Sequence, residues 1–573
     1  MKPNKPKQSI RSAGQKTGAP KPVNTSRKEE EKRKKHWPLL PIPVVAFVLI
    51  WIWAGIWQGD VFRIAREYSF FAPDETLMQF ELCKPYGMLW TLGRCLLMTF
   101  RSPLLGGALL AFILTLGCWL LGYAMRLSPR WRWIQWLPLS LYTCLFAYNG
   151  LNNYFEAETG MLMGIPSAIL AILLVWGIII RSFSRKKVPA FIRIPWDETP
   201  ADNYAQLGVV LLVGLIPSII YGQLERDYVR PISSMQVSNM QQDWEKTIKT
   251  AEANAEMSYR PFAAHYAIAL VQTNQITDRL FNIRLDYDSL HIQGFNGDRQ
   301  NALNMYLMEC DLHAGLVQTA YHHAMENMAM EGPTLRNLKM LCKTALLRGE
   351  WELADKYLTI IGKVPFEGDF VDKYRPMLHH TELVNSDPEF AVIRQTEPMH
   401  DNFENRFIQP VFLGYNAALT EGRSINALYN SLMVNIYTKT MPDFLMRCQG
   451  LEGGTQPASI SQALVLMSSK YPEVFQHFSS LAYYQGDLQN FITETSQYIQ
   501  ARPGITEEEK RELLAMGITP SGSDSLISSE NRALHARELF PRYKGYYPYY
   551  YFFGNLKATK KKETRESSNA GVN

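Results

Sequence analysis

Three polar residues in the segment AYHHAMEN have types and spacing that suit a metal ion. His322 and Glu326 are four residues apart, which places both on one helix face, and His323 lies beside them. A metal site needs a third ligand from elsewhere, and His379 or His380 could supply it. No HExxH motif is present, and exposed polar residues on a helix explain the same letters. We therefore predict no resident metal and keep these residues as the metal candidates.

Acidic residues after the first apolar run suit a second kind of chemistry. A carboxylate of Asp60, Asp74 or Glu75 could hold a metal or activate an acceptor hydroxyl. The arrangement resembles polytopic glycosyltransferases with lipid-linked donors, which place an acidic pair in their first external loop. That resemblance implies a catalytic role for the three acids. Asp74 and Glu75 also follow Pro73, as in an ordinary turn, so a structural role stays open.

Signature motifs of the common enzyme classes are absent from the sequence. There is no P-loop, GxSxG, GxGxxG or protein-kinase set, so we expect no cofactor and favour a function other than catalysis. The seven cysteines, Cys310 among them, show no CxxC spacing, which disfavours disulfides and structural zinc. The net charge of +5 comes from basic termini and short loops, so we expect no nucleic-acid partner.

Long apolar runs fall almost entirely before residue 223, and a polar sequence follows. A helix needs about 20 apolar residues to cross a hydrocarbon core. The runs predict five spans, at about 37–57, 104–125, 133–150, 163–180 and 206–222. A basic disordered tail precedes them, a soluble region follows, and a polar disordered tail ends the chain, at 1–36, 223–555 and 556–573.

Charges in the short loops predict the orientation of these spans. The loop Arg126–Arg132 has three Arg and no acid, and Arg181–Ala205 has five Lys or Arg. Between them, Gly150–Leu162 has two Glu and no base. The positive-inside rule then places the N-terminus in the cytoplasm and residues 223–573 outside it. We expect a bacterial inner-membrane protein with a periplasmic C-terminal domain.

One further apolar stretch complicates this count. Tyr86–Phe100 lies in the expected outer loop, but Arg94 near its middle and Pro103 after it favour an interfacial or re-entrant helix. A true span there stays open as an alternative. It would invert the orientation of everything downstream.

The region after residue 223 predicts helices, because apolar residues recur at positions i, i+3 and i+4. Asn337–Pro365 resembles a tetratricopeptide repeat, with small Cys342, Ala345 and Ala354 on two helices and Gly349 in the turn. A second, poorer match ends at Pro503 and places Gly486 in its turn. The predicted fold is therefore all-α, with a transmembrane bundle followed by an external helical-repeat domain.

The segment Phe540–Phe553 is unusual because it is rich in Tyr and Phe. It could seal the last helices of the domain as an aromatic strand or short helix. Alternatively, it could rest on the outer leaflet or stack against sugars.

The whole layout resembles a family of uncharacterised bacterial polytopic membrane proteins with a C-terminal tetratricopeptide-like domain. Trp37–Gly59, Leu104–Gly222 and Tyr546–Phe553 carry this resemblance. It implies a membrane location and no known activity. We expect a scaffold whose external helices bind an envelope protein, with the bilayer as the other partner. The alternative is a glycosyltransferase that uses the acids of the first external loop.

Overall fold

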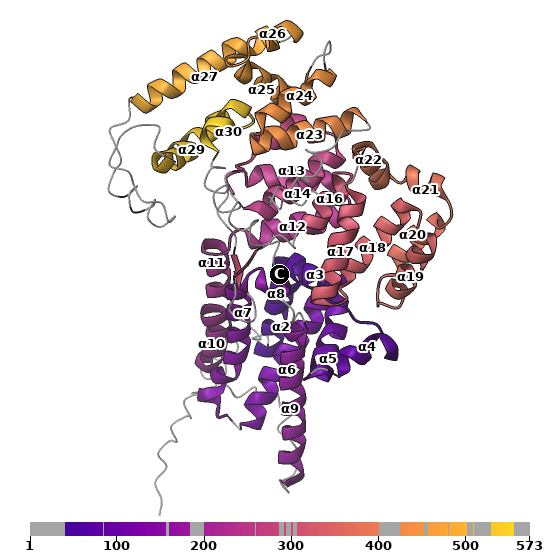
Figure 1. The fold of residues 1–573 in the computed structure, drawn as a ribbon. Coiled ribbons are helices and arrows are strands. Elements are labelled where there is room, and N and C mark those ends of the chain that lie inside the picture. The colour runs from indigo at the N-terminus through magenta and orange to yellow at the C-terminus, as the bar shows by residue number, and fades with distance from the viewer. Residues whose placement is uncertain are drawn as a thin grey trace, which may run out of the picture.

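The computed structural model of the protein describes residues 41–83, 85–125, 127–155, 160–183, 200–257, 259–285, 291–293, 299–301, 306–399, 424–451, 456–478, 481–500, 508, 511 and 529–554. The two terminal tails expected at 1–36 and 556–573 lie outside these residues. Figure 1 shows a lower block of long upright helices, here called the membrane block, and an upper block of shorter helices, here called the helical domain. The membrane block ends with residue 224.

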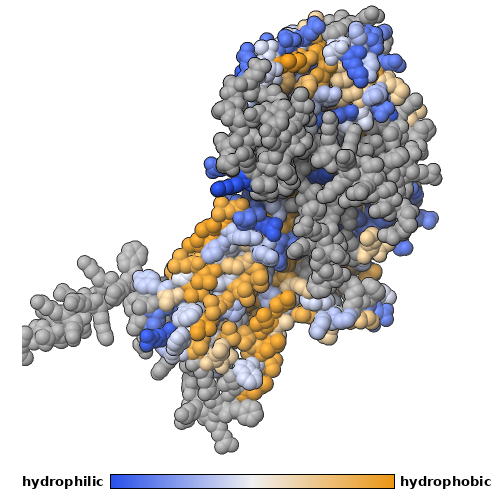
Figure 2. All heavy atoms as spheres, turned by 60° about the vertical axis from the view of Figure 1, so that its left-hand side comes forward, coloured by the Kyte–Doolittle hydropathy of each residue, from blue (hydrophilic) through white to orange (hydrophobic). Residues whose placement is uncertain are grey.

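Among the described residues, the membrane block contains three helices that are long and apolar enough to cross a membrane. They are α6 (Pro103–Ala124), α9 (Met161–Phe183) and the run of α10 (Pro200–Gly208), η4 (Val209–Leu215) and α11 (Ile216–Leu224). The 22 residues of α6 extend about 33 Å, which matches a hydrocarbon core of about 30 Å. Hydrophobic residues cover the surface of this block in Figure 2, and Ile172, Trp176 and Leu212 are among the exposed ones. These features indicate a membrane location.

A bent helix pair provides a fourth candidate span. α2 (Ile42–Ile52) and η1 (Trp53–Trp57) are apolar, and α3 (Gly59–Glu67) follows at an angle of 63°. α3 carries four charged side chains in nine residues and packs against the first helix of the helical domain. Because charges are costly in hydrocarbon, the charged helix α3 turns away from the axis of the apolar helices α2 and η1 at this bend.

The segment expected to span at 133–150 differs from that prediction. It consists of a 3-10 helix, η3 (Pro129–Trp136), followed by α7 (Leu137–Asn149). The 13 residues of α7 extend only about 20 Å, which is short of the hydrocarbon core. Each of the two elements has a proline in its first turn, which explains why the helix restarts there. The five-span count is thus reduced to three or four in the described residues.

The expected outer loop at 59–103 is also helical. It contains α3, α4 (Glu75–Leu82), α5 (Gly87–Leu97) and η2 (Met98–Arg101). The 11 residues of α5 extend roughly 16 Å, too short to cross a membrane. α5 lies against α9, and a Cβ at Gly93 would come within 2.0 Å of the Gly160 carbonyl oxygen. This arrangement agrees with a re-entrant or interfacial helix, which Figure 1 shows beside α6 and α9.

In its described residues, the helical domain consists of many short helices and one hairpin. After α8 (Asn152–Phe155) in the membrane block, its first part contains α12 (Val229–Met240), α13 (Trp244–Ala253), α14 (Arg260–Gln272), α15 (Ile276–Arg279), η5 (Leu280–Asn282), α16 (Leu307–His313), α17 (Val317–Glu331), α18 (Leu335–Arg348), α19 (Trp351–Gly362), α20 (Gly368–Tyr374), η7 (Arg375–Met377), α21 (Thr381–Ser386) and α22 (Pro388–Thr396). The second part contains α23 (Ile425–Thr438), α24 (Met441–Cys448), η9 (Gln449–Leu451), α25 (Ala458–Ser468), α26 (Val474–His477), α27 (Ala482–Gln500), α29 (Ser529–Tyr543) and α30 (Tyr547–Phe553). The antiparallel strands β1 (His291–Gln293) and β2 (Arg299–Asn301) pair His291 with Asn301. The described chain is otherwise helical, as predicted.

The two blocks share a hydrophobic core. One cluster of buried side chains continues from the membrane block, including Trp53 and Phe146, into the helical domain, including Phe262 and Tyr266. A second cluster joins α16–α22 to residues after α3, such as Phe70. Since burial of apolar side chains is the main stabilising term in folding, this continuity fixes the helical domain directly to the membrane block.

The helix pair predicted over Asn337–Pro365 is confirmed. α18 and α19 pack against each other, and Gly349 ends α18 with a left-handed φ of 74°. Cys342, Ala345 and Ala354 are fully buried, so small side chains allow the close approach.

The second predicted turn is wrong. α27 runs unbroken from Ala482 to Gln500, so Gly486 lies inside a helix. The two segments therefore do not share one repeat geometry at this position.

The aromatic segment near the C-terminus is a helix end that closes the domain. Tyr547 and Tyr550 are buried, and their hydroxyls donate hydrogen bonds to the carbonyl oxygens of Ile436 and Tyr437, at 3.1 and 2.8 Å. α30 packs against α25 and α29, and Figure 1 shows it in the upper block beside α23. This geometry favours the sealing role over a membrane belt.

Candidate functional site

A cavity of about 480 Å³, here called the junction cavity, lies between the two blocks. Its walls come from α3 and η2 of the membrane block and from α12, α14, α16, α18, α20 and α22 of the helical domain. Of these elements, α12 and α18 contact α3, and Figure 1 shows α3 at the level where the two blocks join. A volume of this size suits a small-molecule ligand.

Charged side chains dominate the lining. Six are basic, namely Arg63, Arg101, Arg336, Lys339, Lys343 and Lys373. Five are acidic, namely Glu67, Glu309, Glu367, Asp369 and Glu389. Such a set is unusual inside a protein, because removing a charge from water is costly unless it is paired.

Helix α18 supplies the central row of this lining. Arg336, Lys339, Met340 and Lys343 follow a spacing of three and four residues, so they share one face of the helix. The opposite face packs Leu341 and other apolar residues into the core. Thr334 caps the helix by accepting a hydrogen bond from the Asn337 amide, which fixes where the row begins.

A buried ion network holds the two blocks together beside the cavity. Arg66 on α3 lies 2.8 Å from Glu67 and 2.5 Å from Glu367, and its side chain is completely buried. Lys339 lies 2.9 Å from each of the same two carboxylates. Arg66 also donates hydrogen bonds to the carbonyl oxygens of Met98 and Pro365. The network therefore joins α3, α18 and the segment before α20.

A second network surrounds Glu389 on α22. Lys343 lies 2.7 Å away, and the Gln242 amide and the Tyr374 hydroxyl donate hydrogen bonds at 2.7 and 3.3 Å. Burial would raise the pKa of Glu389, but Lys343 and then His313 outweigh it and lower the pKa to about 2. Glu389 is thus held as a carboxylate, which makes it a poor proton acceptor.

A third pair closes the wall near α3. Arg336 lies 2.5 Å from Glu309 on α16, and its guanidinium stacks over the Tyr68 ring at 4.8 Å. The planar fork of an arginine suits this combination of a carboxylate and an aromatic face.

Two buried polar side chains in the wall have unsatisfied atoms. Within the described part of the chain, neither ring nitrogen of His265 and not the side-chain oxygen of Gln236 has a hydrogen-bond partner. His265 is 1% exposed and Gln236 is 4% exposed. Burial, with a smaller contribution from Arg336, lowers the pKa of His265 to about 3, so the imidazole is neutral. Buried polar groups normally have partners, so these atoms are exceptions in the cavity wall.

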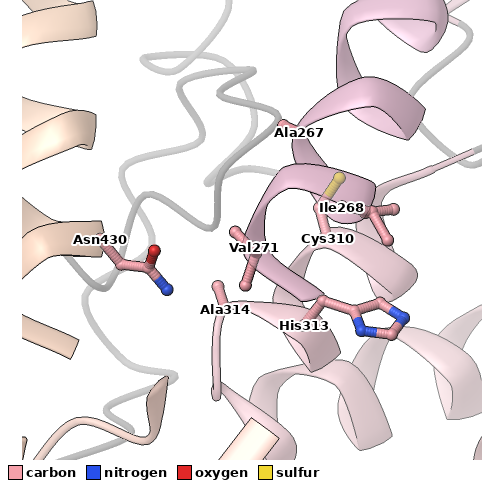
Figure 3. Close-up of a pocket in the computed structure, with 7 residues that line it drawn as sticks. All are labelled: Ala267, Ile268, Val271, Cys310, His313, Ala314 and Asn430. Carbon is pink, nitrogen blue, oxygen red and sulfur yellow. The ribbon is translucent and has the colours of Figure 1, made fainter. Parts of the chain in front are cut away.

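A much smaller cavity, of about 10 Å³, lies behind the His265 helix and is lined by Cys310 and His313 of α16. Figure 3 shows Cys310 and Ala314 on one side and Asn430 on another, with the His313 ring directed away from Asn430. His313 instead contacts Gln272, at 2.7 Å. Burial lowers the pKa of His313 to about 4 and raises that of Cys310 well above its ordinary value. A cavity of this size holds about one water molecule.

The metal candidates are not gathered into one site. His322 pairs with Glu326 at 3.0 Å on an exposed helix face, as their spacing predicts. His323 turns to Asp311 instead, at 2.7 Å. Over the described ranges, no group of three or more His, Cys, Asp or Glu side chains could hold a metal ion.

The acids of the first loop are not gathered either. Asp74 accepts a hydrogen bond from the Leu77 amide at the start of α4 and pairs with Lys363 at 2.7 Å. Hydrogen bonds from Lys363, Thr76 and Leu77 hold the pKa of Asp74 well below its usual range. Glu75 is exposed in the first turn of α4, and Asp60 lies in the first turn of α3. Because Asp74 caps α4 and pairs with Lys363, it has a structural role. No described contact joins Asp60 to Asp74 or Glu75.

Sequence reasoning missed the junction cavity. The one available signal was the row Arg336, Lys339 and Lys343 at helical spacing on one segment. The acids that pair with this row are 27 to 272 residues away in sequence, so no local pattern shows the pairing.

The fold and this cavity define a helical membrane protein with a charged site at the base of a large helical domain. Residues 151–554 match a family of unknown function, DUF6057, and the chain belongs to that family. No curated protein and no solved structure matches the chain. The predicted relationship to a family without known activity is thus confirmed, while its tetratricopeptide-like character stays a prediction.

Proposed function

We propose that this protein is a membrane-embedded binding protein that holds a small polar solute in the junction cavity. The observation that carries the proposal is the cavity of about 480 Å³ with two buried, unsatisfied polar side chains, His265 and Gln236, in its wall. Natural ligand sites have volumes of about 300 to 1,000 Å³ and a few converging polar groups. The pairing of Glu389 with Lys343 supports binding over acid–base catalysis.

We further propose that the protein lies in a bacterial inner membrane with its helical domain in the periplasm. The basic loops at 126–132 and 181–205 support a cytoplasmic location for the opposite end of the membrane block. The solute would then come from the periplasm or from the outer leaflet.

A panel of polar solutes tests the binding function. Purified protein in neutral detergent is mixed with sugars, amino acids, polyols or phosphate esters, and its melting temperature is measured. In addition, the compounds that the purified protein releases on denaturation are identified by mass spectrometry. A ligand that binds only the folded state raises the melting temperature. We expect at least one solute to raise it by several degrees.

Two matched variants make this test specific. Met240 is 41% exposed and lines the cavity, so Met240→Trp should narrow it and reduce the shift. Met330, 81% exposed on α17, does not line the cavity, so Met330→Trp should keep the shift. A wild-type protein that no solute stabilises and that releases no compound would contradict the proposal.

The protein-binding scaffold expected from the sequence is a second proposal. Its support is the compact pair of α18 and α19, which resembles a repeat unit used for protein binding. Crosslinking in cells through a photoreactive residue at exposed Phe366 would test it, and the absence of any specific adduct would count against it. The glycosyltransferase alternative has less support, because Asp74 is engaged in capping α4 and in its pair with Lys363.

A further inference from the structure

Five of the six lining cations have a carboxylate at ion-pair distance. They are Arg101, Arg336, Lys339, Lys343 and Lys373. Among the described residues, no carboxylate lies within ion-pair distance of Arg63, and Glu67 and Asp60, on the same helix α3, act on it only at longer range. The Arg63 guanidinium instead meets the uncharged amide of Gln241. With the amide oriented so that its oxygen faces Arg63, this oxygen accepts hydrogen bonds from both terminal nitrogens, at 2.9 and 3.1 Å.

A second guanidinium, that of Arg101, lines the same cavity. Burial and then repulsion from Arg101 lower the pKa of Arg63, and Glu67 and Asp60 offset this only in part. The ion pair of Arg101 with Asp369, at 3.2 Å, is a weak competitor, because the Asp369 side chain is 87% exposed. Two half-buried arginines that face one cavity and repel each other are stabilised when an anion lies between them.

The number of arginines indicates which anion fits. A carboxylate has two oxygens and matches one guanidinium fork, whereas a phosphate offers more oxygens and up to two charges for two forks. The rest of the wall offers uncharged groups: neutral His265 can donate and accept a hydrogen bond, and the Gln236 oxygen can accept one. Hydroxyl groups are the natural partners for such atoms.

We infer that the junction cavity binds a hydroxyl-bearing phosphate ester, with the phosphate held by Arg63 and Arg101 and the hydroxyl groups met by His265 and Gln236. This inference rests on the proposed binding function and names the ligand class of that same cavity. A soluble glycerophosphate and the headgroup of phosphatidylglycerol share this chemistry. Either source can reach α3, which starts at the bend that ends the apolar α2 and η1.

Two probes separate these sources. The protein in neutral detergent is titrated with sn-glycerol 3-phosphate, with sodium chloride at equal ionic strength as the salt control. In parallel, the protein is reconstituted into vesicles of phosphatidylcholine with or without phosphatidylglycerol, and its thermal stability is compared. A response to the soluble ester supports a soluble ligand, and a response to phosphatidylglycerol alone supports a lipid headgroup.

Arginine variants then locate the binding site. Loss of a charge-assisted contact should weaken the response about tenfold to a hundredfold in Arg63→Gln and in Arg101→Gln. Arg63→Lys keeps the charge but not the fork, so it should recover part of the binding. Arg348→Gln is the matched control, because Arg348 is also partly buried, with 26% exposure, and lies outside the cavity.

The outcomes distinguish this inference from the binding function itself. The phosphate site is wrong if neither phosphate probe stabilises the wild type. It is also wrong if the probes stabilise the Arg63 and Arg101 variants as much as the wild type. If an uncharged solute then stabilises the wild type more than Met240→Trp, the cavity still binds a ligand and only its assigned class fails.

Discussion

At the scale of single residues, the most informative groups are the buried charges between the two blocks. Arg66 and Glu67 on α3 meet Lys339 and Glu367 from a region about 270 residues later. A buried ion pair contributes little net stability compared with apolar residues, but leaving one partner alone is costly. The network therefore favours one alignment of α3 against α18, two helices that line the junction cavity.

Buried histidines give the first prediction, which concerns pH. His265 and His313 have pKa values of about 3 and 4, below the ordinary value of 6.5, so the unfolded chain binds protons that the folded protein does not. Stability should therefore be complete above about pH 6.5 and fall as the pH drops toward 4. From pH 7 to 5.5 we expect a loss of about 1 kcal/mol for each histidine.

Melting temperatures across this pH range provide the measurement. His265→Asn should reduce the slope between pH 7 and 5.5, whereas His380→Asn, at an exposed position, should leave it unchanged. An equal slope in all three proteins would show that buried histidine does not control acid stability.

At the scale of elements, two glycines have opposite roles. Gly349 ends α18 in the left-handed region, where a side chain is strained even though the nearest atom, of Trp351, is 3.7 Å away. Gly486 lies inside α27, where no atom lies within 4 Å of an added Cβ among the described residues. The same residue type thus favours a helix end in one place and weakens a helix in the other.

Alanine substitutions should therefore shift stability in opposite directions. Gly349→Ala should destabilise the protein by about 1 kcal/mol, because alanine adopts positive φ poorly. Gly486→Ala should stabilise it by about 0.5 to 1 kcal/mol through helix propensity. Chemical unfolding monitored by circular dichroism in detergent gives both values, and a loss of stability in Gly486→Ala would argue for a turn there.

At the scale of the whole molecule, the shared core fixes the helical domain to one end of the membrane block. The chain leaves α11 at Leu224 and enters α12 at Val229, so the domain begins where the last apolar helix ends. Whichever side receives residue 224 also receives the junction cavity.

Reporter fusions determine that side. A reporter that is active only outside the cytoplasm should be active when fused after Gln223 and silent when fused at Arg130, because the loop near Arg130 is basic. The reverse pattern would place the cavity in the cytosol and would remove the outer leaflet as a source of its ligand.

The fold was predictable where the signal is local. Apolar runs identified α6, α9 and α11, and small residues flanking Gly349 identified the α18 and α19 pair. The structure of the segment at 133–150 was not predictable in this way. Prolines in the first turns of η3 and α7 restart the helix and leave α7 too short to cross a membrane. The candidate chemistry at His322 and Asp74 was predicted from sequence spacing alone. In the structure, His322 pairs with Glu326 and Asp74 pairs with Lys363, and these pairs account for the two side chains without a reaction.

By itself, the sequence determined the class of the protein: a basic start, apolar helices long enough to cross a membrane, and a large helical domain after residue 223. These properties depend on composition and on periodicity within one element, which a single segment carries. Only the tertiary structure decided the site. The junction cavity needs Arg63, His265 and Lys343, which belong to three helices far apart in sequence, and it exists because a shared core packs those helices around one space. Contacts between such distant residues leave no pattern in any one segment, so packing alone brings these charges together.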